Sequence, residues 1–132
     1  MDQRSKADAL RALHVPGRPL VLLNAWDAGS AAVIARAGAP AIATTSAGAA
    51  NALGYPDGQL VTREQMLSTV APIARAVNLP VTADMEAGYG DDPEDAEATA
   101  RGVVEAGAVG LNLEDTAGSG DDQLLPIDRF VA

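Results

Sequence analysis

The sequence contains no cysteine, and aromatic residues make up only 3% of it. Without cysteine the chain can form no disulfide and no thiolate metal site, and it has no cysteine nucleophile or acid. This usage fits a reducing compartment, so we expect a cytoplasmic protein. With so few aromatic side chains, the core must be packed from small and branched aliphatic residues.

Long apolar runs are absent as well. No stretch approaches the ~20 apolar residues that cross a bilayer, so we expect no membrane span. The first six residues, MDQRSK, lead into a short mixed helix and not into a long apolar segment. We therefore expect no secretory signal.

Basic residues are scarce, with nine against eighteen acids and a net charge of −9. Residues 84–128 contain thirteen of the acids and one base, Arg101. This balance argues against nucleic acid and anionic membranes as partners. A solvated surface explains many of the acids, whereas a cation site would explain a few.

The 132 residues, 48% of them apolar, suit one domain with a real core, spanning 1–132. Apolar runs without polar alternation predict strands at about 20–26, 41–46, 80–86 and 109–115. Caps, breakers and helical patterns predict helices at 5–13, 28–37, 62–77 and 93–106, and a last one from Pro126. We expect an α/β fold with four parallel strands, either half of a (β/α)₈ barrel or a small doubly wound sheet.

Local signals support the helix starts. Asp27 can cap the second helix, and T-R-E-Q at 62–65 is a capping box. Asp92 with Pro93 opens the fourth helix. Residues 47–61, rich in Gly and Asn with a Pro-Asp-Gly turn, predict a long functional loop.

Three of the four strands end in acids. Alternation along a strand puts Asp84 and Glu86 on one face, and Asn112 and Glu114 on one face of the next strand, while Asp115 points away. Converging carboxylates suit Mg²⁺ or Mn²⁺. The alternative is that each acid caps the following helix or faces solvent.

Other polar residues allow two interpretations each. Asp27 and Asp57 suit a helix cap and a turn as well as a site, and Trp26 and Tyr89 could line a site or pack. The segment 44–48 could present N–H groups and hydroxyls to a carboxylate or phosphate. Neither a Walker lysine nor GxGxxG is present, so nucleotide binding is disfavoured. The single histidine, His14, we expect to be structural or solvated.

Five segments, in order, resemble the isocitrate lyase/phosphoenolpyruvate mutase superfamily: NAWDAGS (24–30), TTSAG (44–48), LGYPDG (53–58), ADMEAGYG (83–90) and GLNLED (110–115). The similarity covers about residues 15–130. It implies a (β/α)₈ TIM-type barrel of about twice this length, of which this chain would be the N-terminal half. A half-barrel has open sheet edges, so we expect it to pair, and the full-length form to be a homo-oligomer.

The resemblance also implies roles for particular residues. It implies Mg²⁺ held by Asp84, Glu86 and Glu114, with Asp57, Trp26 and Asp27 as candidate catalytic residues. It implies that Thr45, Ser46, Ala47 and Gly48 bind the carboxylate of a small α-keto acid or related substrate. The chemistry implied is cleavage or formation of a C–C or P–C bond through the enolate of a pyruvate-like unit.

Two positions depart from the family pattern. Glu86 stands where the motif has a second Asp, which lengthens the side chain by one methylene. The lyases' Lys-x-Cys-Gly-His loop is replaced by T-A-G-S-G-D-D-Q at 116–123, so we do not expect isocitrate cleavage by their mechanism. Two further hypotheses are a non-catalytic fragment that needs a partner half, and a response-regulator-like doubly wound domain, which the long loop suits poorly.

Overall fold

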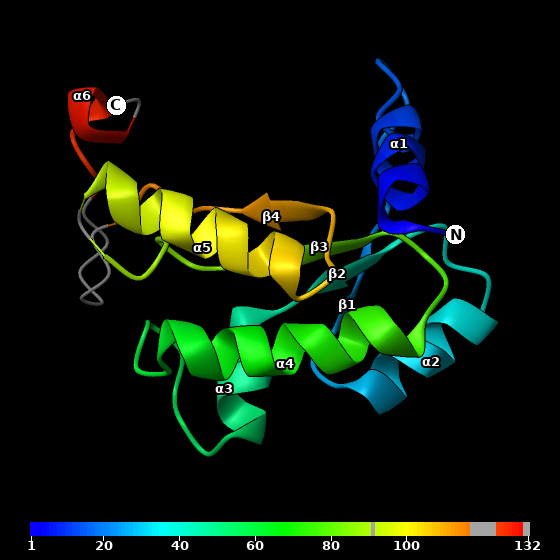
Figure 1. The fold of residues 1–132 in the computed structure, drawn as a ribbon, viewed down its shortest axis with the longest axis horizontal. Coiled ribbons are helices and arrows are strands. Elements are labelled where there is room, and N and C mark those ends of the chain that lie inside the picture. The colour runs from blue at the N-terminus through cyan, green and yellow to red at the C-terminus, as the bar shows by residue number, and fades with distance from the viewer. Residues whose placement is uncertain (91, 117–123, 131–132) are drawn as a thin grey trace.

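A computed structural model describes residues 1–90, 92–116 and 124–130 of the chain. Its elements, in order, are α1 (Gln3–Leu13), β1 (Leu23–Ala25), α2 (Ala28–Arg36), β2 (Ile42–Thr44), α3 (Ser46–Ala52), α4 (Arg63–Ala76), β3 (Val81–Asp84), α5 (Pro93–Glu105), β4 (Gly110–Asn112) and α6 (Ile127–Phe130). Figure 1 shows the central strands with the longer helices around them. The α/β class is confirmed.

The four strands form one parallel sheet in the order β1-β2-β3-β4. Leu23 pairs with Ile42, and Thr82 pairs with Gly110, so neighbouring strands run in register. Each strand lies inside its predicted range but is shorter than that range. In the described part of the chain, β1 and β4 pair on one side only, which leaves two open sheet edges.

Side-chain caps start two of the helices that cover the sheet. Asp27 accepts a hydrogen bond from the Ser30 N–H (2.6 Å), and Ser30 Oγ accepts one from the Asp27 backbone N–H (3.1 Å). Thr62 and Gln65 make the same reciprocal pair at α4. The caps predicted at Asp27 and Thr62 are confirmed, since a capping box depends only on residues three apart. Asp92 stands at the N-cap position of α5 as predicted but makes no side-chain cap hydrogen bond.

The predicted loop over 47–61 is wrong in its first part. Residues Ser46–Ala52 form α3, with Thr45 as N-cap. The Gly and Asn of this segment suggested a loop, but alanine, the best helix former, occupies most of its positions. Only the 53–61 segment is irregular, and it joins α3 to α4.

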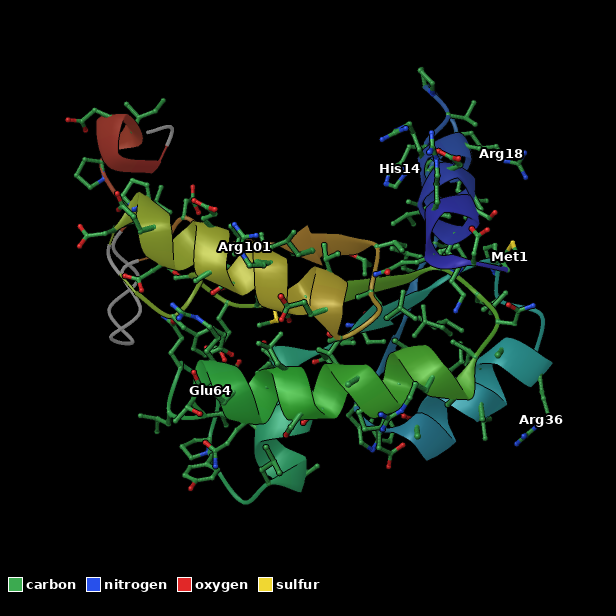
Figure 2. The ribbon with its side chains drawn as sticks, in the orientation of Figure 1. Met1, His14, Arg18, Arg36, Glu64 and Arg101 are labelled. Atoms are coloured by element: carbon green, nitrogen blue, oxygen red, sulfur yellow. The ribbon has the colours of Figure 1, made fainter. Side chains whose placement is uncertain are left out.

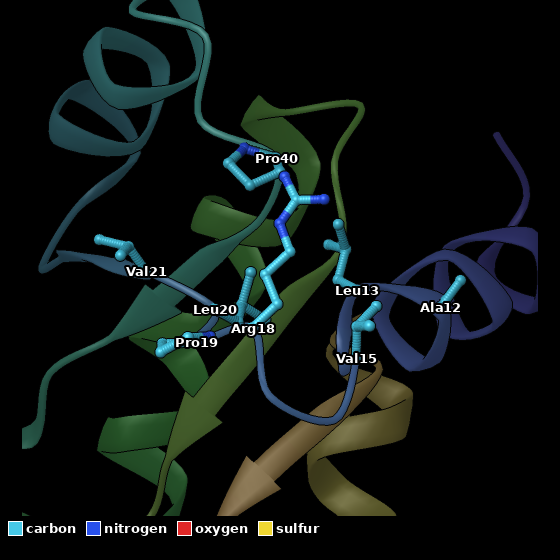
Figure 3. Close-up of a pocket in the computed structure, with 8 residues that line it drawn as sticks. All are labelled: Ala12, Leu13, Val15, Arg18, Pro19, Leu20, Val21 and Pro40. Atoms are coloured by element: carbon cyan, nitrogen blue, oxygen red, sulfur yellow. The ribbon is translucent and has the colours of Figure 1, made fainter.

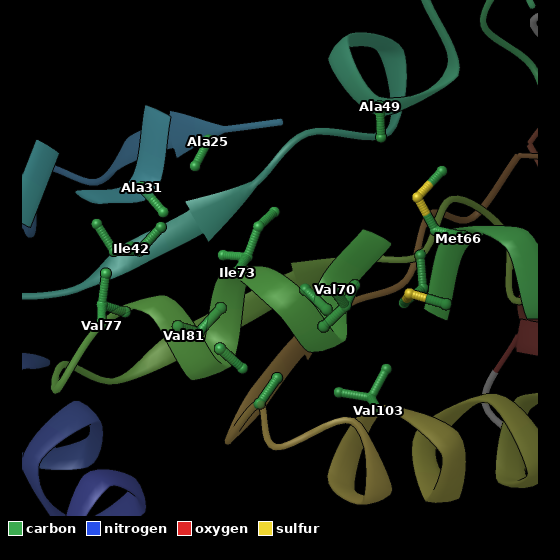
Figure 4. Packing of buried hydrophobic residues seen from close by; sticks show 14 of the residues in the cluster. Ala25, Ala31, Ile42, Ala49, Met66, Val70, Ile73, Val77, Val81 and Val103 are labelled. Carbon is green, nitrogen blue, oxygen red and sulfur yellow. The ribbon is translucent and has the colours of Figure 1, made fainter. Parts of the chain in front are cut away.

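The core lies between the sheet and α4 (Figure 4). Ile42 and Val81 from the strands, Val70 and Ile73 from α4, and Val103 from α5 are all at most 1% exposed. Burying each such aliphatic side chain contributes roughly 1.5–3 kcal/mol. Helix α2 packs on α4, and α4 packs on α5, so the three form one layer over the sheet.

Helix α1 stands apart from that layer, beside the strand ends (Figures 1 and 2). The Gln3 side-chain amide donates to the carbonyl oxygens of Val104 (2.7 Å) and Ala108 (3.0 Å). Lys6 Nζ donates to the Val77 carbonyl at 3.0 Å. The first helix is thus held by the ends of α4 and α5. No helix in the described residues is long and apolar enough to span a membrane.

Candidate active site

Asp84 closes strand β3 and is held by the first residue of α3. Ser46, which is 5% exposed, donates its backbone N–H (2.9 Å) and its hydroxyl (2.8 Å) to Asp84 Oδ2. The Asp84 N–H in turn donates to Thr44 Oγ1 at 2.9 Å. Because β2 and β3 are parallel neighbours, their carboxyl ends meet. The predicted substrate-binding segment and the first predicted metal ligand, Asp84, are therefore in contact at the carboxyl ends of β2 and β3.

Glu86 reaches the same place by a different route from the one predicted. Strand β3 ends at Asp84, and Glu86 has a φ of 49°, so strand alternation does not extend to it. The prediction that strand alternation places Glu86 on the same face as Asp84 was therefore wrong. The chain instead makes a tight turn after Asp84, in which the Glu86 N–H donates to Asp84 Oδ1 at 3.3 Å. The Glu86 side chain is buried, with 4% exposure.

Both oxygens of the Glu86 carboxylate are hydrogen bonded. The Gln59 N–H donates to Oε2, and the Tyr89 hydroxyl donates to Oε1 at 3.3 Å. Burial raises the pKa of Glu86, the carboxylates of Asp57 and Asp84 raise it further, and the Gln59 bond opposes them. Burial and the adjacent Glu86 charge also raise the pKa of the Tyr89 hydroxyl, which keeps it a proton donor.

A second set of contacts fixes the turn behind Glu86. Thr99 on α5 is fully buried, and its hydroxyl donates to the Gly88 carbonyl at 2.6 Å. Arg63 Nε donates to the same hydroxyl at 2.8 Å, and its Nη2 donates to the Tyr89 carbonyl (3.0 Å) and to Asp95 Oδ1 (3.0 Å). The first turn of α4 and the middle of α5 therefore clamp residues 88–89.

The remaining predicted ligand and the loop acid lie nearby. Asp57 is exposed on the 53–61 segment and close enough to Glu86 to raise its pKa. The Glu114 N–H donates to the Glu86 carbonyl at 2.7 Å, while its exposed carboxylate accepts a bond from Thr116 Oγ1 (3.4 Å). Backbone pairing therefore places Glu114 beside the Glu86 turn.

The fit of these residues to Mg²⁺ follows from their chemistry and burial. Among the described residues, no three His, Cys, Asp or Glu side chains are already gathered around one point. Asp84 and Glu86 are nevertheless adjacent hard-oxygen donors whose negative charges disfavour each other. Mg²⁺ commonly binds through one or two carboxylates and keeps several waters. These residues fit such an ion.

The 45–48 segment forms the first turn of α3. Thr45 Oγ1 accepts the Gly48 N–H at 3.2 Å. A side chain at Gly48 would approach Thr45 Cγ2 at 2.6 Å and Trp26 Cβ at 3.1 Å, so the backbone packs closely there. With Ala47 on the same turn, all four residues predicted to bind a carboxylate stand at one helix start, next to Asp84.

Trp26 and Asp27 lie at the end of β1. The Asp27 carboxylate caps α2, and the bond from the Ser30 N–H is the largest cause that lowers its pKa. Trp26 is 47% exposed. A cavity of about 570 Å³ lies beside them, lined also by Leu23, Val33 and Ile34. This places both residues at the open β1 edge, and their catalytic role stays a prediction.

A second cavity, of about 340 Å³, lies where the chain enters β1 and β2 (Figure 3). Leu13, Val15, Pro40 and Arg18 line it. It is at the amino ends of these strands, whereas Asp84 stands at the carboxyl end of β3.

His14 is exposed at the end of α1, as expected, with Nδ1 at 2.8 Å from the Leu10 carbonyl oxygen. The charged side chains labelled in Figure 2, among them Arg36 and Glu64, are exposed as well.

Three residues of this arrangement were not predicted: Gln59, Arg63 and Thr99. Thr44 belongs to the 44–48 segment, whose hydroxyls were expected to face a ligand, and its Oγ1 accepts the Asp84 N–H. Gln59 follows the Pro-Asp-Gly turn by one residue, which is the only sequence signal that could have indicated it. Residues 117–123 of the segment that departs from the lyase loop lie outside the described residues.

Sequence comparison matches residues 10–132 to the family described as phosphoenolpyruvate phosphomutase. A 2-methylisocitrate lyase from Escherichia coli is 32% identical over 120 residues, which is 90% of this chain and 40% of that protein. An uncharacterized protein from Mycobacterium tuberculosis is 39% identical over 105 residues, covering 80% of this chain and 39% of its own length. The chain thus spans about two fifths of these relatives.

Comparison with solved structures gives matches of the same kind. A candidate phosphonomutase from Burkholderia cenocepacia J2315 superposes with a TM-score of 0.91 and 46% identity, over 95% of this chain and 50% of that one. An oxaloacetate acetylhydrolase in complex with oxalate superposes with a TM-score of 0.84 and 27% identity, over 96% of this chain and 45% of that one. On these grounds the chain belongs to the phosphoenolpyruvate phosphomutase family, within the superfamily that includes the isocitrate lyases.

Proposed function

We propose that this chain carries the metal-binding part of a Mg²⁺-dependent lyase or mutase. The substrate would be a small α-keto acid or a related carboxylate, and the reaction would make or break a C–C or P–C bond. The relatives' activities support this class, since they include 2-methylisocitrate lyase, oxaloacetate decarboxylase and 2,3-dimethylmalate lyase.

The single observation that carries the proposal is the meeting of Asp84 and Glu86 with the first turn of α3. Asp84 and Glu86 would hold Mg²⁺, with Glu114 and Asp57 contributing through water. Bound Mg²⁺ would offset the negative charge of an enolate derived from the substrate. Thr45, Ser46, Ala47 and Gly48 would receive the substrate carboxylate at this helix start, where the N–H groups of Ser46 and Gly48 would exchange their present bonds to Asp84 Oδ2 and Thr45 Oγ1 for bonds to the substrate.

Ser46 has a specific part in this scheme. Its N–H and hydroxyl already bind Asp84 Oδ2, so it orients the acid before a ligand arrives. Thr44 supports the same acid from the backbone side. Neighbours of this kind keep a ligand's geometry and typically change metal affinity by about 10–100-fold when removed.

Mg²⁺ binding is tested on the purified protein by calorimetric titration and thermal melting. We expect Mg²⁺ to raise the melting temperature, and Asp84→Asn to abolish that rise. Asp115→Asn is the matched control, because Asp115 lies one residue beyond Glu114 and is assigned no role. An unchanged Mg²⁺ response in Asp84→Asn would refute the metal assignment.

Turnover is tested with 2-methylisocitrate, 2,3-dimethylmalate, oxaloacetate and phosphonopyruvate, each with Mg²⁺ and with Mn²⁺. Formation of pyruvate or another α-keto acid from the first three substrates, or of phosphoenolpyruvate from phosphonopyruvate, faster than in protein-free samples with the same metal ion, would support the proposed chemistry. Metal binding without turnover of any substrate would favour the second hypothesis, a non-catalytic half that needs a partner. Sedimentation of the same samples tests the expected pairing of this half through its open sheet edges.

A further inference from the structure

Three non-glycine residues of the described chain have a left-handed backbone: Gln59 (φ 58°), Glu86 (φ 49°) and Tyr89 (φ 63°). Such conformations are unfavourable for residues with a side chain, and they persist where surrounding contacts enforce them. These three residues come from two separate segments, 53–61 and 85–90. Their shared conformation therefore calls for a shared physical cause.

The same three residues are joined by a closed ring of hydrogen bonds. The Gln59 N–H donates to Glu86 Oε2, and the Tyr89 hydroxyl donates to Glu86 Oε1 (3.3 Å). The Tyr89 N–H donates to Gln59 Oε1 at 2.9 Å. Each residue contacts both others: Gln59 and Tyr89 each use one backbone N–H and one side-chain atom, whereas Glu86 makes both contacts through its carboxylate.

We propose that Gln59 is a positioning residue that fastens the Asp57-bearing segment to the Glu86 carboxylate and so sets the geometry of the acidic site. This role rests on the proposed function, because it acts through Glu86 as a metal ligand. Asp57 lies two residues before Gln59, so the ring fixes how close the two acids come. The effect of the Asp57 charge on the pKa of Glu86 agrees with that closeness.

Gln59 is the member of the ring that ties the 53–61 segment to the site. Thr99 and Arg63 hold the segment of Glu86 and Tyr89 from α5 and α4. The 53–61 segment is anchored near its ends, by the bond from the Tyr55 N–H to the Ala50 carbonyl (2.9 Å) and by Val61, which is buried in the core at 1% exposure. Between these anchors, the two bonds of Gln59 attach the segment to Glu86 and Tyr89.

Hydrogen exchange of the metal-free protein tests the attachment. We expect Gln59→Ala to speed exchange in peptides covering 53–61 and 86–90, while strand β2 and helix α5 keep wild-type exchange. Leu60→Ala is the matched control, since Leu60 is adjacent in sequence, 59% exposed and outside the ring. Gln59→Gly provides a second variant, because glycine keeps the N–H and accepts the positive φ without strain.

Calorimetric Mg²⁺ titration of the same variants tests the positioning role. We expect about 10-fold weaker binding in Gln59→Ala and Gln59→Gly, and unchanged binding in Leu60→Ala. Tyr89→Phe should weaken Mg²⁺ binding but leave exchange at 53–61 unchanged, since it keeps the bond between the Tyr89 N–H and Gln59.

The two measurements separate the possible failures. Wild-type exchange in Gln59→Ala would overturn the attachment, and faster exchange with unchanged Mg²⁺ affinity would overturn the positioning role. If the wild-type protein bound no Mg²⁺, the proposed function would fail, while the exchange result would still decide whether Gln59 fastens the segment.

Discussion

Replacing Thr99 by valine tests whether one buried hydroxyl holds the turn that carries Glu86. Valine has nearly the shape of threonine and a similar helix propensity, so the substitution removes little except the hydroxyl. In the wild type this hydroxyl donates to the Gly88 carbonyl and accepts the Arg63 Nε–H. Both partners lose that bond in Thr99→Val.

The expected loss follows from the surroundings of the two partners. An unsatisfied buried carbonyl such as that of Gly88 costs about 1–3 kcal/mol. The Arg63 side chain is 21% exposed and keeps its bonds to Tyr89 and Asp95, so we expect it to add less than about 1 kcal/mol. The free energy of unfolding should therefore fall by about 1–4 kcal/mol, a large share of the ~5–15 kcal/mol of a typical domain.

Urea denaturation with linear extrapolation measures this change, and two variants serve as controls. Thr99→Ser keeps the hydroxyl and should lose only about 1 kcal/mol for the missing methyl group. Thr69→Val removes a weaker bond, from Thr69 Oγ1 to the Gln65 carbonyl within α4 (3.3 Å), and should change stability little. If Thr99→Val were as stable as Thr99→Ser, the Thr99 hydroxyl would not hold the turn that carries Glu86.

Substitutions at four further positions test other parts of the fold. At pH 7 Asp27→Ala should melt below Asp27→Asn, which keeps an acceptor for the Ser30 N–H. That bond lowers the pKa of Asp27 below its unfolded value of 3.8, so its contribution to folding stability is full above pH 3.8 and is lost as the pH falls through the pKa of the folded protein. Melting temperatures measured across this acid range should show the loss in wild type but not in Asp27→Asn. Gly88→Ala should lower stability by about 1–3 kcal/mol in urea titrations, since Gly88 has a φ of 93°, whereas Gly29→Ala, inside α2, should raise it by up to about 1 kcal/mol. Ile73→Ala should cost about 2–5 kcal/mol and Ile73→Val about 0.5–1.5 kcal/mol, and equal losses would contradict tight packing around this buried side chain.

The sequence predicted those features that depend on neighbouring residues. The caps at Asp27 and Thr62 need only a partner three positions away, and the start of α5 at Pro93 follows from a local rule. The four strands were found because buried parallel strands are continuous apolar runs. Composition misled at residues 46–52, where Gly and Asn outweighed alanine in the prediction but not in the fold.

The site was predictable in its acids but not in what holds them. Asp84 and Glu86 were found as charges at a strand end, although Glu86 arrives there by a left-handed turn and not by alternation. Gln59 lies 27 residues from Glu86, and Thr99 lies 36 from Arg63. No local pattern specifies such partners, since they depend on how helices pack after the chain has folded.

The docking of α1 has a consequence for folding during synthesis. Gln3 bonds to the carbonyls of Val104 and Ala108, which follow it by 101 and 105 residues. At roughly 5–20 residues per second, a ribosome needs roughly 5–20 seconds to add them. Helix α1 thus leaves the ribosome well before the residues that dock it, and until they follow, Leu10, its buried side chain, is exposed to chaperones.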